Sequence, residues 1–225
     1  MTYGPHASGA DAPRVFIIGL NRCGTTSLHR LFTASNVPAL HWRREHDTRN
    51  LAQTMMLNIG LGLPPMHGFW KARVFSDMSY VDGHTIIEGA RFFRELDAAY
   101  PNAYFILNSR PLDDWLASRI HHANGSYLTR CLKASGLSEE ALIARWADLF
   151  VQHERDVTAY FKGNPRFLRF DIDRDDPQTI ADLVAPDFTL DISAWHHSNK
   201  GSAKSLLSSP GTNTINPQNS IQLEV

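Results

Sequence analysis

The stretch VFIIGLNRCGTTSLHRLF, residues 15–32, joins an apolar segment to a glycine-containing turn and then to a segment with helical periodicity. Gly19 and Gly24 have the spacing of the phosphate-binding loop G-x-x-x-x-G-K-[ST]. The lysine of that motif is missing, because Thr25 and Thr26 follow Gly24. The stretch therefore predicts a phosphate site whose positive charge comes from another residue.

The turn has the chemistry that an anion needs. It precedes a helix start, where unpaired backbone N–H groups and the helix dipole favour negative charge. Arg22 places a permanent positive charge within the loop. The missing lysine argues against an ATPase or kinase, because that lysine reaches the β- and γ-phosphates. The predicted phosphate-binding set is Asn21, Arg22, Cys23, Gly24, Thr25, Thr26 and Ser27.

Apolar, strand-like segments alternate with helix-like segments along the chain. The expected strands cover residues 14–20, 38–42, 73–76, 103–109 and 166–170. The expected helices cover residues 25–34, 48–59, 86–99, 111–120, 139–161 and 178–184, with Ser138 as the N-cap of the longest. Residues 77–84 are expected to be irregular and residues 121–136 to form a loop. This alternation predicts an α/β fold with a parallel sheet and helices on both faces, with ligands beyond the carboxyl ends of the strands.

Length and composition favour one folded domain. The chain has 225 residues, of which 43% are hydrophobic, enough for a full core. We expect a flexible N-terminus over residues 1–13, one domain over 14–204, and a tail over 205–225 that is disordered or a loosely docked arm, since it is rich in Ser, Asn and Pro.

Charge and residue usage exclude several classes of function. The net charge of -1 opposes general binding to nucleic acid or to an anionic membrane. The two cysteines form no disulfide framework and no zinc spacing, and the eleven histidines contain no helix pair backed by a glutamate, so no metal is expected. No apolar stretch approaches the roughly 18 residues of a membrane span. We expect a soluble, cytoplasmic protein.

A second motif follows a later apolar strand. In FILNSRPLDDWLASR, residues 105–119, Arg110 stands at the strand end and Ser118 lies on the face of the next helix that begins there. Arginine offers a bidentate grip on phosphate and serine offers a hydroxyl. Together with the first loop, this motif indicates a ligand with two separated phosphates.

These two motifs, GLNRCGTTSL and FILNSRPLDDWLAS, resemble those of the sulfotransferases that use 3′-phosphoadenosine 5′-phosphosulfate (PAPS). The resemblance extends over residues 14–201 and includes FLRFDIDRDDPQTIADLVAPDF. It implies PAPS as the sulfuryl donor, the first loop as the 5′-phosphosulfate site, and Arg22 as the catalytic basic residue. It further implies that Arg110 and Ser118 bind the 3′-phosphate. Lys200 and Gly201 stand where the family has a loop that closes over the nucleotide.

The sequence offers several candidates for the general base, the residue that takes the proton from the acceptor's hydroxyl group. Asp77 occupies the position of the catalytic histidine of many family members, and a buried carboxylate can act as a base. Asp77 is equally suited to cap the following turn. His41, at the end of the second expected strand, is the next candidate, followed by His84 with Glu88.

The sequence leaves the identity of the acceptor open, and it allows two alternatives to sulfuryl transfer. Residues 42–84 and 121–136 are expected to line the acceptor pocket, and their aromatic and methionine side chains suit an alcohol, a phenol or a lipid, without excluding a sugar or peptide. The alternatives to a sulfotransferase are a nucleotide kinase with an aberrant loop and a non-catalytic nucleotide-binding module. A kinase would leave Arg110 and Ser118 without a special role.

Overall fold

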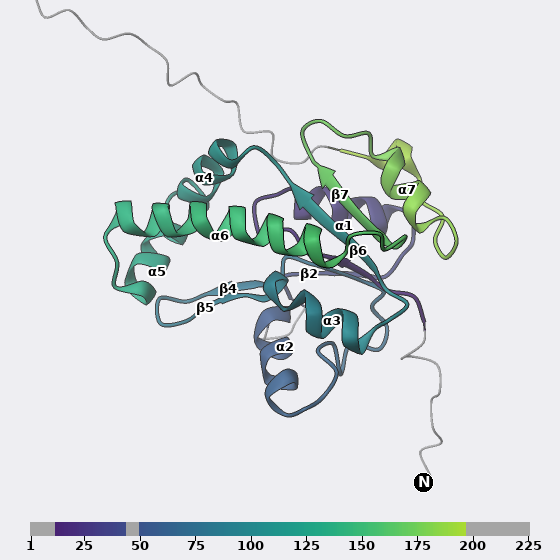
Figure 1. Cartoon of the computed structure of the whole chain (residues 1–225), viewed down its shortest axis with the longest axis horizontal. Helices are drawn as coiled ribbons and strands as arrows, with labels where there is room; N and C mark the ends of the chain where they lie inside the picture. The colour runs from purple at the N-terminus through teal and green to yellow at the C-terminus, as the bar shows by residue number, and fades with distance from the viewer. Residues whose placement is uncertain (1–11, 44–49, 197–225) are drawn as a thin grey trace, which may run out of the picture.

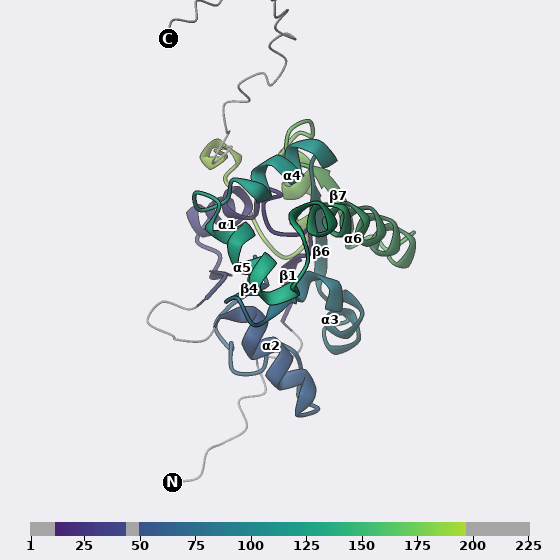
Figure 2. The same ribbon diagram turned by 90° about the vertical axis from the view of Figure 1, so that its left-hand side faces the viewer.

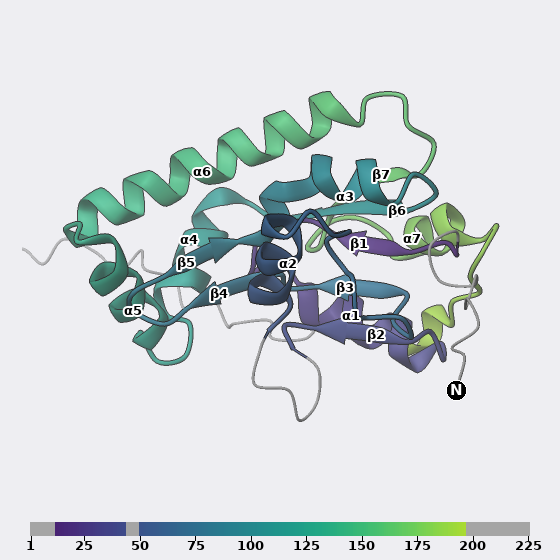
Figure 3. The same ribbon diagram turned by 90° about the horizontal axis from the view of Figure 1, so that it is seen from below.

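A central parallel sheet organises the computed structural model, which describes residues 12–43 and 50–196. Within these residues the sheet has five strands in the order β2-β3-β1-β6-β7 (Figure 3). The strands are β1 (Val15–Ile17), β2 (Ala39–His41), β3 (Val74–Ser76), β6 (Tyr104–Ser109) and β7 (Phe167–Asp171). All neighbouring pairs are parallel. The parallel α/β fold expected from the alternation of segments is confirmed.

Helices cover both faces of this sheet, so its strands are apolar on both sides (Figure 1). On one face, Val15 and Ile17 pack with α1 (Thr25–Ala34) and α7 (Gln178–Val184). On the other, Phe16 packs in a cluster that includes side chains of α2 (Leu51–Gly60), α3 (Phe93–Ala99) and α6 (Glu139–Tyr160). The observed bounds of α1 and α7 are those expected from the sequence, and Ser138 accepts a hydrogen bond from Ala141 N–H at the start of α6.

A third hydrophobic cluster lies at the end of the molecule where β6 leads into α4 (Leu112–Ile120), next to α5 (Ser126–Ser135) and the first half of α6 (Figures 1 and 2). Arg119 is fully buried inside it, with the guanidinium carbon 4.7–5.2 Å from the ring centroids of Trp115, Tyr127 and Trp146. Glu88 accepts a hydrogen bond from Arg119 and forms an ion pair with it. This pair ties α4 to the segment that follows β3.

The expectations for residues 77–99 are partly wrong. Residues 77–84 are not wholly irregular, because β4 (Ser79–Val81) and β5 (Ile86–Glu88) form an antiparallel hairpin. Asp82 holds its turn by accepting hydrogen bonds from the N–H groups of His84 and Thr85. Helix does not begin at residue 86. The chain forms β5, then a 3-10 turn, η1 (Gly89–Phe92), and α3 starts at Phe93.

The expected loop over residues 121–136 contains a helix. Gly125 and Gly136, both with positive φ, bracket α5, whose Tyr127 and Cys131 are buried. Helix α2 begins at Leu51, where Asn50 and Gln53 form a capping box. The expectations for residues 44–49, for most of the N-terminus, and for the tail from residue 205 lie outside the described residues.

Candidate active site

One buried side chain of β6 clamps the loop after β1. Asn108 accepts a hydrogen bond from Gly19 N–H at 2.8 Å and donates one to the Cys23 carbonyl oxygen at 2.6 Å. A Cβ atom on residue 19 would lie 1.9 Å from the Asn108 carbonyl oxygen, so this position requires glycine. The clamp fixes both ends of the loop to the middle of the sheet.

The carbonyl oxygens of the loop point toward side chains of β6 and α4 and toward Arg110 between them. The Asn21 carbonyl oxygen accepts from the Trp115 indole N–H at 2.9 Å, and the Arg22 carbonyl oxygen accepts from Arg110 Nη1 at 3.4 Å. Together with the Asn108 bond to Cys23, three successive carbonyl groups are held by side chains. This arrangement suits an anion, because carbonyl oxygens that faced it would repel it.

Gly24 closes the loop and opens α1. Its φ is 77°, in the left-handed region, and a Cβ atom there would lie 2.4 Å from the side chain of Ile172, which follows β7. Thr25 and Ser27, in the first turn of α1, are buried, whereas Thr26 is half-buried. The loop is therefore packed between β6, α4 and the turn after β7.

The two sequence motifs meet in space. Arg22 Nε donates a hydrogen bond to Ser118 Oγ of α4 at 3.2 Å, and Arg110 contacts the Arg22 carbonyl oxygen. Arg110 Nη2 also forms an ion pair with Asp173 at 3.4 Å. Burial lowers the pKa of Arg22, an effect opposed by Asp77 and reinforced by Arg110. An arginine stays protonated in spite of such a shift.

Asp77 follows β3 directly and faces the same region. Its side chain is 21% exposed, and its Oδ1 accepts a hydrogen bond from Ser79 Oγ at 2.6 Å. Burial raises the pKa of Asp77, and Glu88 acts in the same direction, whereas the Ser79 hydrogen bond, His122 and Arg22 oppose the rise. Both roles considered for Asp77 thus have support in the geometry, since it holds the turn through Ser79 and is a partly buried carboxylate near Arg22.

His41, at the end of β2, connects Asp77 to the loop helix. Its Nε2 lies 3.8 Å from Asp77 Oδ2 and 3.5 Å from Thr26 Oγ1, and its Nδ1 lies 3.0 Å from Ser76 Oγ. Ser76 Oγ donates to the Leu40 carbonyl oxygen, so we assign the His41 proton to Nδ1 and the lone pair to Nε2. Burial, together with Arg30, lowers the pKa of His41 to about 4, which leaves the ring neutral at pH 7.

Backbone strain marks three adjacent strand ends. Arg22, Trp42 and Asp77, which follow β1, β2 and β3, have φ values of 74°, 61° and 51°. Positive φ is uncommon for residues other than glycine, and such conformations concentrate at functional sites. Arg22 and Asp77 are themselves part of the candidate site, and Trp42 follows His41 directly.

Three further residues belong to this region, although the sequence motifs do not single them out. Asn108 has a signal in the sequence, as a polar residue within an apolar strand. His122 interacts electrostatically with both Arg22 and Asp77, and burial lowers its pKa. It lies in the turn that follows α4, four residues after Ser118. Asp173, by contrast, has no signal beyond its place in an acidic turn.

The other candidate bases, His84 and Glu88, have different surroundings, although Glu88 acts electrostatically on Asp77. His84 lies exposed in the hairpin turn, and Glu88 pairs with Arg119. Lys200 and Gly201 lie outside the described residues. Within residues 12–43 and 50–196, no group of three or more His, Cys, Asp or Glu side chains is placed to hold a metal ion.

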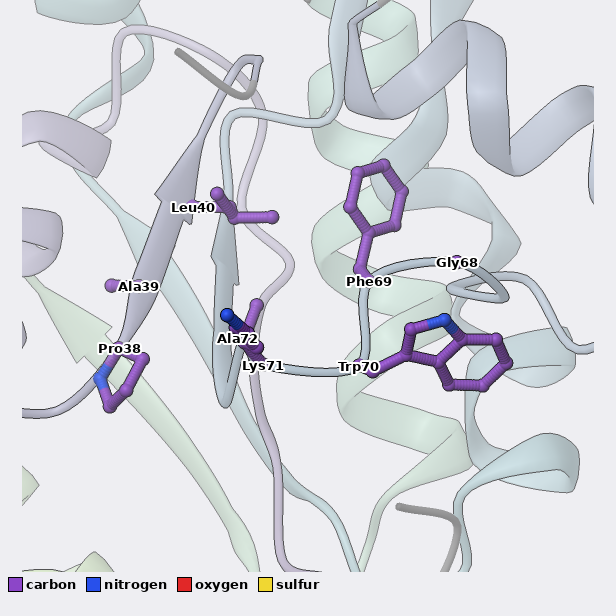
Figure 4. Close-up of a pocket in the computed structure, with 8 residues that line it drawn as sticks. All are labelled: Pro38, Ala39, Leu40, Gly68, Phe69, Trp70, Lys71 and Ala72. Atoms are coloured by element: carbon purple, nitrogen blue, oxygen red, sulfur yellow. The ribbon is translucent and has the colours of Figure 1, made fainter. Parts of the chain in front are cut away.

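A cavity of about 480 Å³ lies beside the first part of β2, away from the loop (Figure 4). Its lining residues are Pro38, Ala39, Leu40, Gly68, Phe69, Trp70, Lys71 and Ala72. Of the aromatic and methionine side chains expected around the acceptor, Met55, Met66 and Phe69 are buried in the core against the sheet. These three support the fold, Phe69 also lines the cavity, and the expectation that they line an acceptor pocket stays a prediction.

Comparison with known proteins supplies the family. A family model described as a sulfotransferase domain matches residues 14–156, which is more than half of the chain. The protein therefore belongs to this sulfotransferase family, whose members transfer sulfuryl groups. None of the curated proteins compared with the chain matches it. In the part of the chain that the structure describes, no helix is long and apolar enough to cross a membrane.

Proposed function

We propose that the protein transfers the sulfuryl group of PAPS to a hydroxyl or amine acceptor by in-line displacement. The observation that carries this proposal is the contact of Arg22 with Ser118 and Arg110, which unites the two anion-binding motifs in one site. We further propose that residues 14–204 form the catalytic domain. The cytoplasmic location stays a prediction.

Two parts of the site would hold the two ends of the nucleotide. The loop backbone and the hydroxyl groups at the start of α1 suit the 5′-phosphosulfate, because N–H groups and the helix dipole point toward an anion placed there. Arg110 and Ser118 are proposed to bind the 3′-phosphate. Lys200 and Gly201 are proposed, from the family pattern alone, to close over it.

Arg22 would supply the charge that the transfer needs. The acceptor oxygen attacks sulfur while the bond from sulfur to the bridging oxygen of the 5′-phosphate breaks, and the electron pair stays on that oxygen. Arg22 is permanently charged, so it stabilises the leaving oxygen electrostatically and donates no proton. With a hydroxyl acceptor the products are a sulfate ester, the 3′,5′-bisphosphate and one proton; an amine attacks through nitrogen and gives a sulfamate in place of the ester.

Asp77 would accept that proton. Its raised pKa makes it a better base than an ordinary carboxylate, and it is close enough to Arg22 for the two charges to interact. His41 would orient Thr26, whose hydroxyl can donate to its neutral Nε2, and its own pKa of about 4 makes it a weak base. His122 faces the same charges and would contact the acceptor.

The test is transfer of labelled sulfuryl from PAPS to a panel of phenols, alcohols, sugars and amines. We expect a labelled product with at least one acceptor class, with release of the bisphosphate in equal amount. Arg22→Ala should reduce kcat by about 10²–10³-fold, the usual cost of removing one group that stabilises a developing oxyanion. Full activity of Arg22→Ala, or phosphate transfer from ATP in place of sulfuryl transfer, would contradict the proposal.

A further inference from the structure

The turn after β7 brings a carboxylate to the arginine of the second motif. Asp173 Oδ2 lies 3.4 Å from Arg110 Nη2. The Arg110 side chain is 19% exposed, whereas Asp173 is a surface residue whose side chain is 26% exposed. Ile172 N–H donates to the Ser109 carbonyl oxygen at 2.9 Å, which extends the β6–β7 ladder beyond the Ser109–Asp171 pair. Arg110 follows Ser109 at the end of β6, and Asp173 follows Ile172 after β7. The backbone pairing of the two strands therefore sets Arg110 and Asp173 side by side.

Local contacts hold Asp173 in this place. Its N–H donates to Asp171 Oδ1 at 3.0 Å, and Asp175 accepts from Asp171 N–H at 2.7 Å, so the turn is fixed by its own carboxylates. Ile172, between these residues, packs against Gly24 of the loop. The backbone of Asp173 is thus held next to the phosphate loop, while its side chain lies at the surface, where it can turn.

We propose that Asp173 is a specificity-determining residue of the donor site, whose carboxylate occupies Arg110 in the empty protein and is displaced when a 3′-phosphate binds. This inference rests on the proposed function. A carboxylate and a phosphate use the same guanidinium N–H groups in the same planar geometry, so they compete for Arg110. Asp173 then lowers the affinity of the site for nucleotides that carry a 3′-phosphate. It leaves the affinity for nucleotides without a 3′-phosphate unchanged.

The direction of the effect follows from the charges. Two negative groups that share one guanidinium lie within a few ångströms of each other and repel. Arg110 keeps a second anchor, the Arg22 carbonyl oxygen, so it stays in place when Asp173 loses its charge. The nearby acids Glu154 and Asp171 form ion pairs with Arg169 and Arg174, so their charges are offset by cations other than Arg110.

This competition also bears on turnover. A partly buried guanidinium without a counterion is costly, and Asp173 would supply that counterion between reaction cycles. When the bisphosphate product leaves, the carboxylate replaces the phosphate on Arg110. Asp173 therefore favours product release, a step that often limits the rate of well-adapted enzymes.

The test is calorimetric titration of the full chain with adenosine 3′,5′-bisphosphate and with adenosine 5′-phosphate. Asp173→Asn keeps an oxygen that can accept from Arg110 but removes the charge. We expect this variant to bind the bisphosphate about fivefold or more tightly than the wild type, and to bind the 5′-phosphate within about twofold of the wild type. Asp182→Asn, an exposed acid of α7 that hydrogen-bonds Gln178, removes the same net charge and should change neither affinity.

A kinetic measurement separates this role from a merely structural one. Asp173→Asn should lower the KM for PAPS and strengthen inhibition by the bisphosphate, while kcat stays equal or falls. Equal or weaker bisphosphate binding by Asp173→Asn, in a wild type that does bind it, overturns the role of Asp173 and leaves the proposed function intact. A wild type that binds no bisphosphate overturns the proposed function, and the role of Asp173 with it.

Discussion

At the scale of single residues, the site is built from groups whose protonation is set by their surroundings. Arg22 keeps its charge in spite of burial, His41 loses its ordinary basicity, and Asp77 gains basicity. Burial is the largest cause in all three cases. Shifts of opposite sense in neighbouring groups are typical of acid–base sites.

The pH dependence of the reaction tests the role of Asp77. Because burial raises its pKa above the usual 3.8, kcat/KM should rise as the pH increases through that raised pKa and the carboxylate loses its proton. Asp77→Asn should abolish this rise and lower kcat by about 10²–10⁴-fold. The measurement is a pH–rate profile of both proteins. An unchanged profile in the variant would assign the proton to another group.

At the scale of elements, the loop after β1 depends on the two hydrogen bonds that Asn108 of β6 makes with it. Asn108→Ala removes both hydrogen bonds of the clamp and leaves the Gly19 N–H and the Cys23 carbonyl group unpaired. We expect the free energy of unfolding to fall by about 2–4 kcal/mol. Nucleotide affinity should fall as well, because the loop loses its fixed conformation.

Chemical denaturation and nucleotide titration of Asn108→Ala measure both effects. The matched control is Asn164→Ala, since Asn164 also bonds a backbone N–H group, that of Arg166, but lies in the distant turn before β7. Loss of affinity in the control as large as in Asn108→Ala would show that the clamp acts through stability alone.

The contact between α1 and β2 predicts sensitivity to acid. His29 and His41 stack with their ring centroids 5.3 Å apart, and burial lowers the pKa of each from 6.5 to about 4. The unfolded chain therefore binds more protons between these values, so stability is full above pH 6.5 and is lost as the pH falls toward 4. Each pKa unit corresponds to about 1.4 kcal/mol.

Denaturation curves between pH 4 and 7 check this expectation. His29→Phe keeps an aromatic ring in the stack but removes one titrating group, and His29 Nδ1 has no hydrogen-bond partner among the described residues to lose. The variant should lose less stability on acidification than the wild type. An identical pH dependence would show that the stack does not cause it.

The sequence predicted those parts of the fold and site that local rules determine. The strand–loop–helix of residues 15–34 and the helix Gln178–Val184 follow from periodicity and glycine spacing, and both are confirmed. The sequence does not predict the hairpin β4–β5, because its strands of three residues each, Ser79–Val81 and Ile86–Glu88, are too short for a period to be recognised. The ion pair of Arg110 and Asp173 depends on sheet register, which no local pattern reveals.

At the scale of the whole molecule, the buried pair of Arg119 and Glu88 joins the cluster around α4 and α5 to the segment after β3. Glu88→Gln would leave the charge of Arg119 buried among aromatic rings without a counterion. We expect the free energy of unfolding to fall by about 3–5 kcal/mol. Asp156→Asn, in the exposed pair with Arg155, should cost at most about 1 kcal/mol. Equal effects of the two variants in thermal denaturation would contradict the role of the buried pair.

The central claim is that the loop after β1 and Arg110 form one site for a nucleotide with two separated phosphates. Calorimetric titration with adenosine 3′,5′-bisphosphate, with ATP as the control and Arg110→Ala alongside, tests it most directly. We expect tight binding of the bisphosphate that Arg110→Ala loses, and no comparable binding of ATP. Binding of ATP without binding of the bisphosphate would contradict a two-phosphate site and favour a kinase.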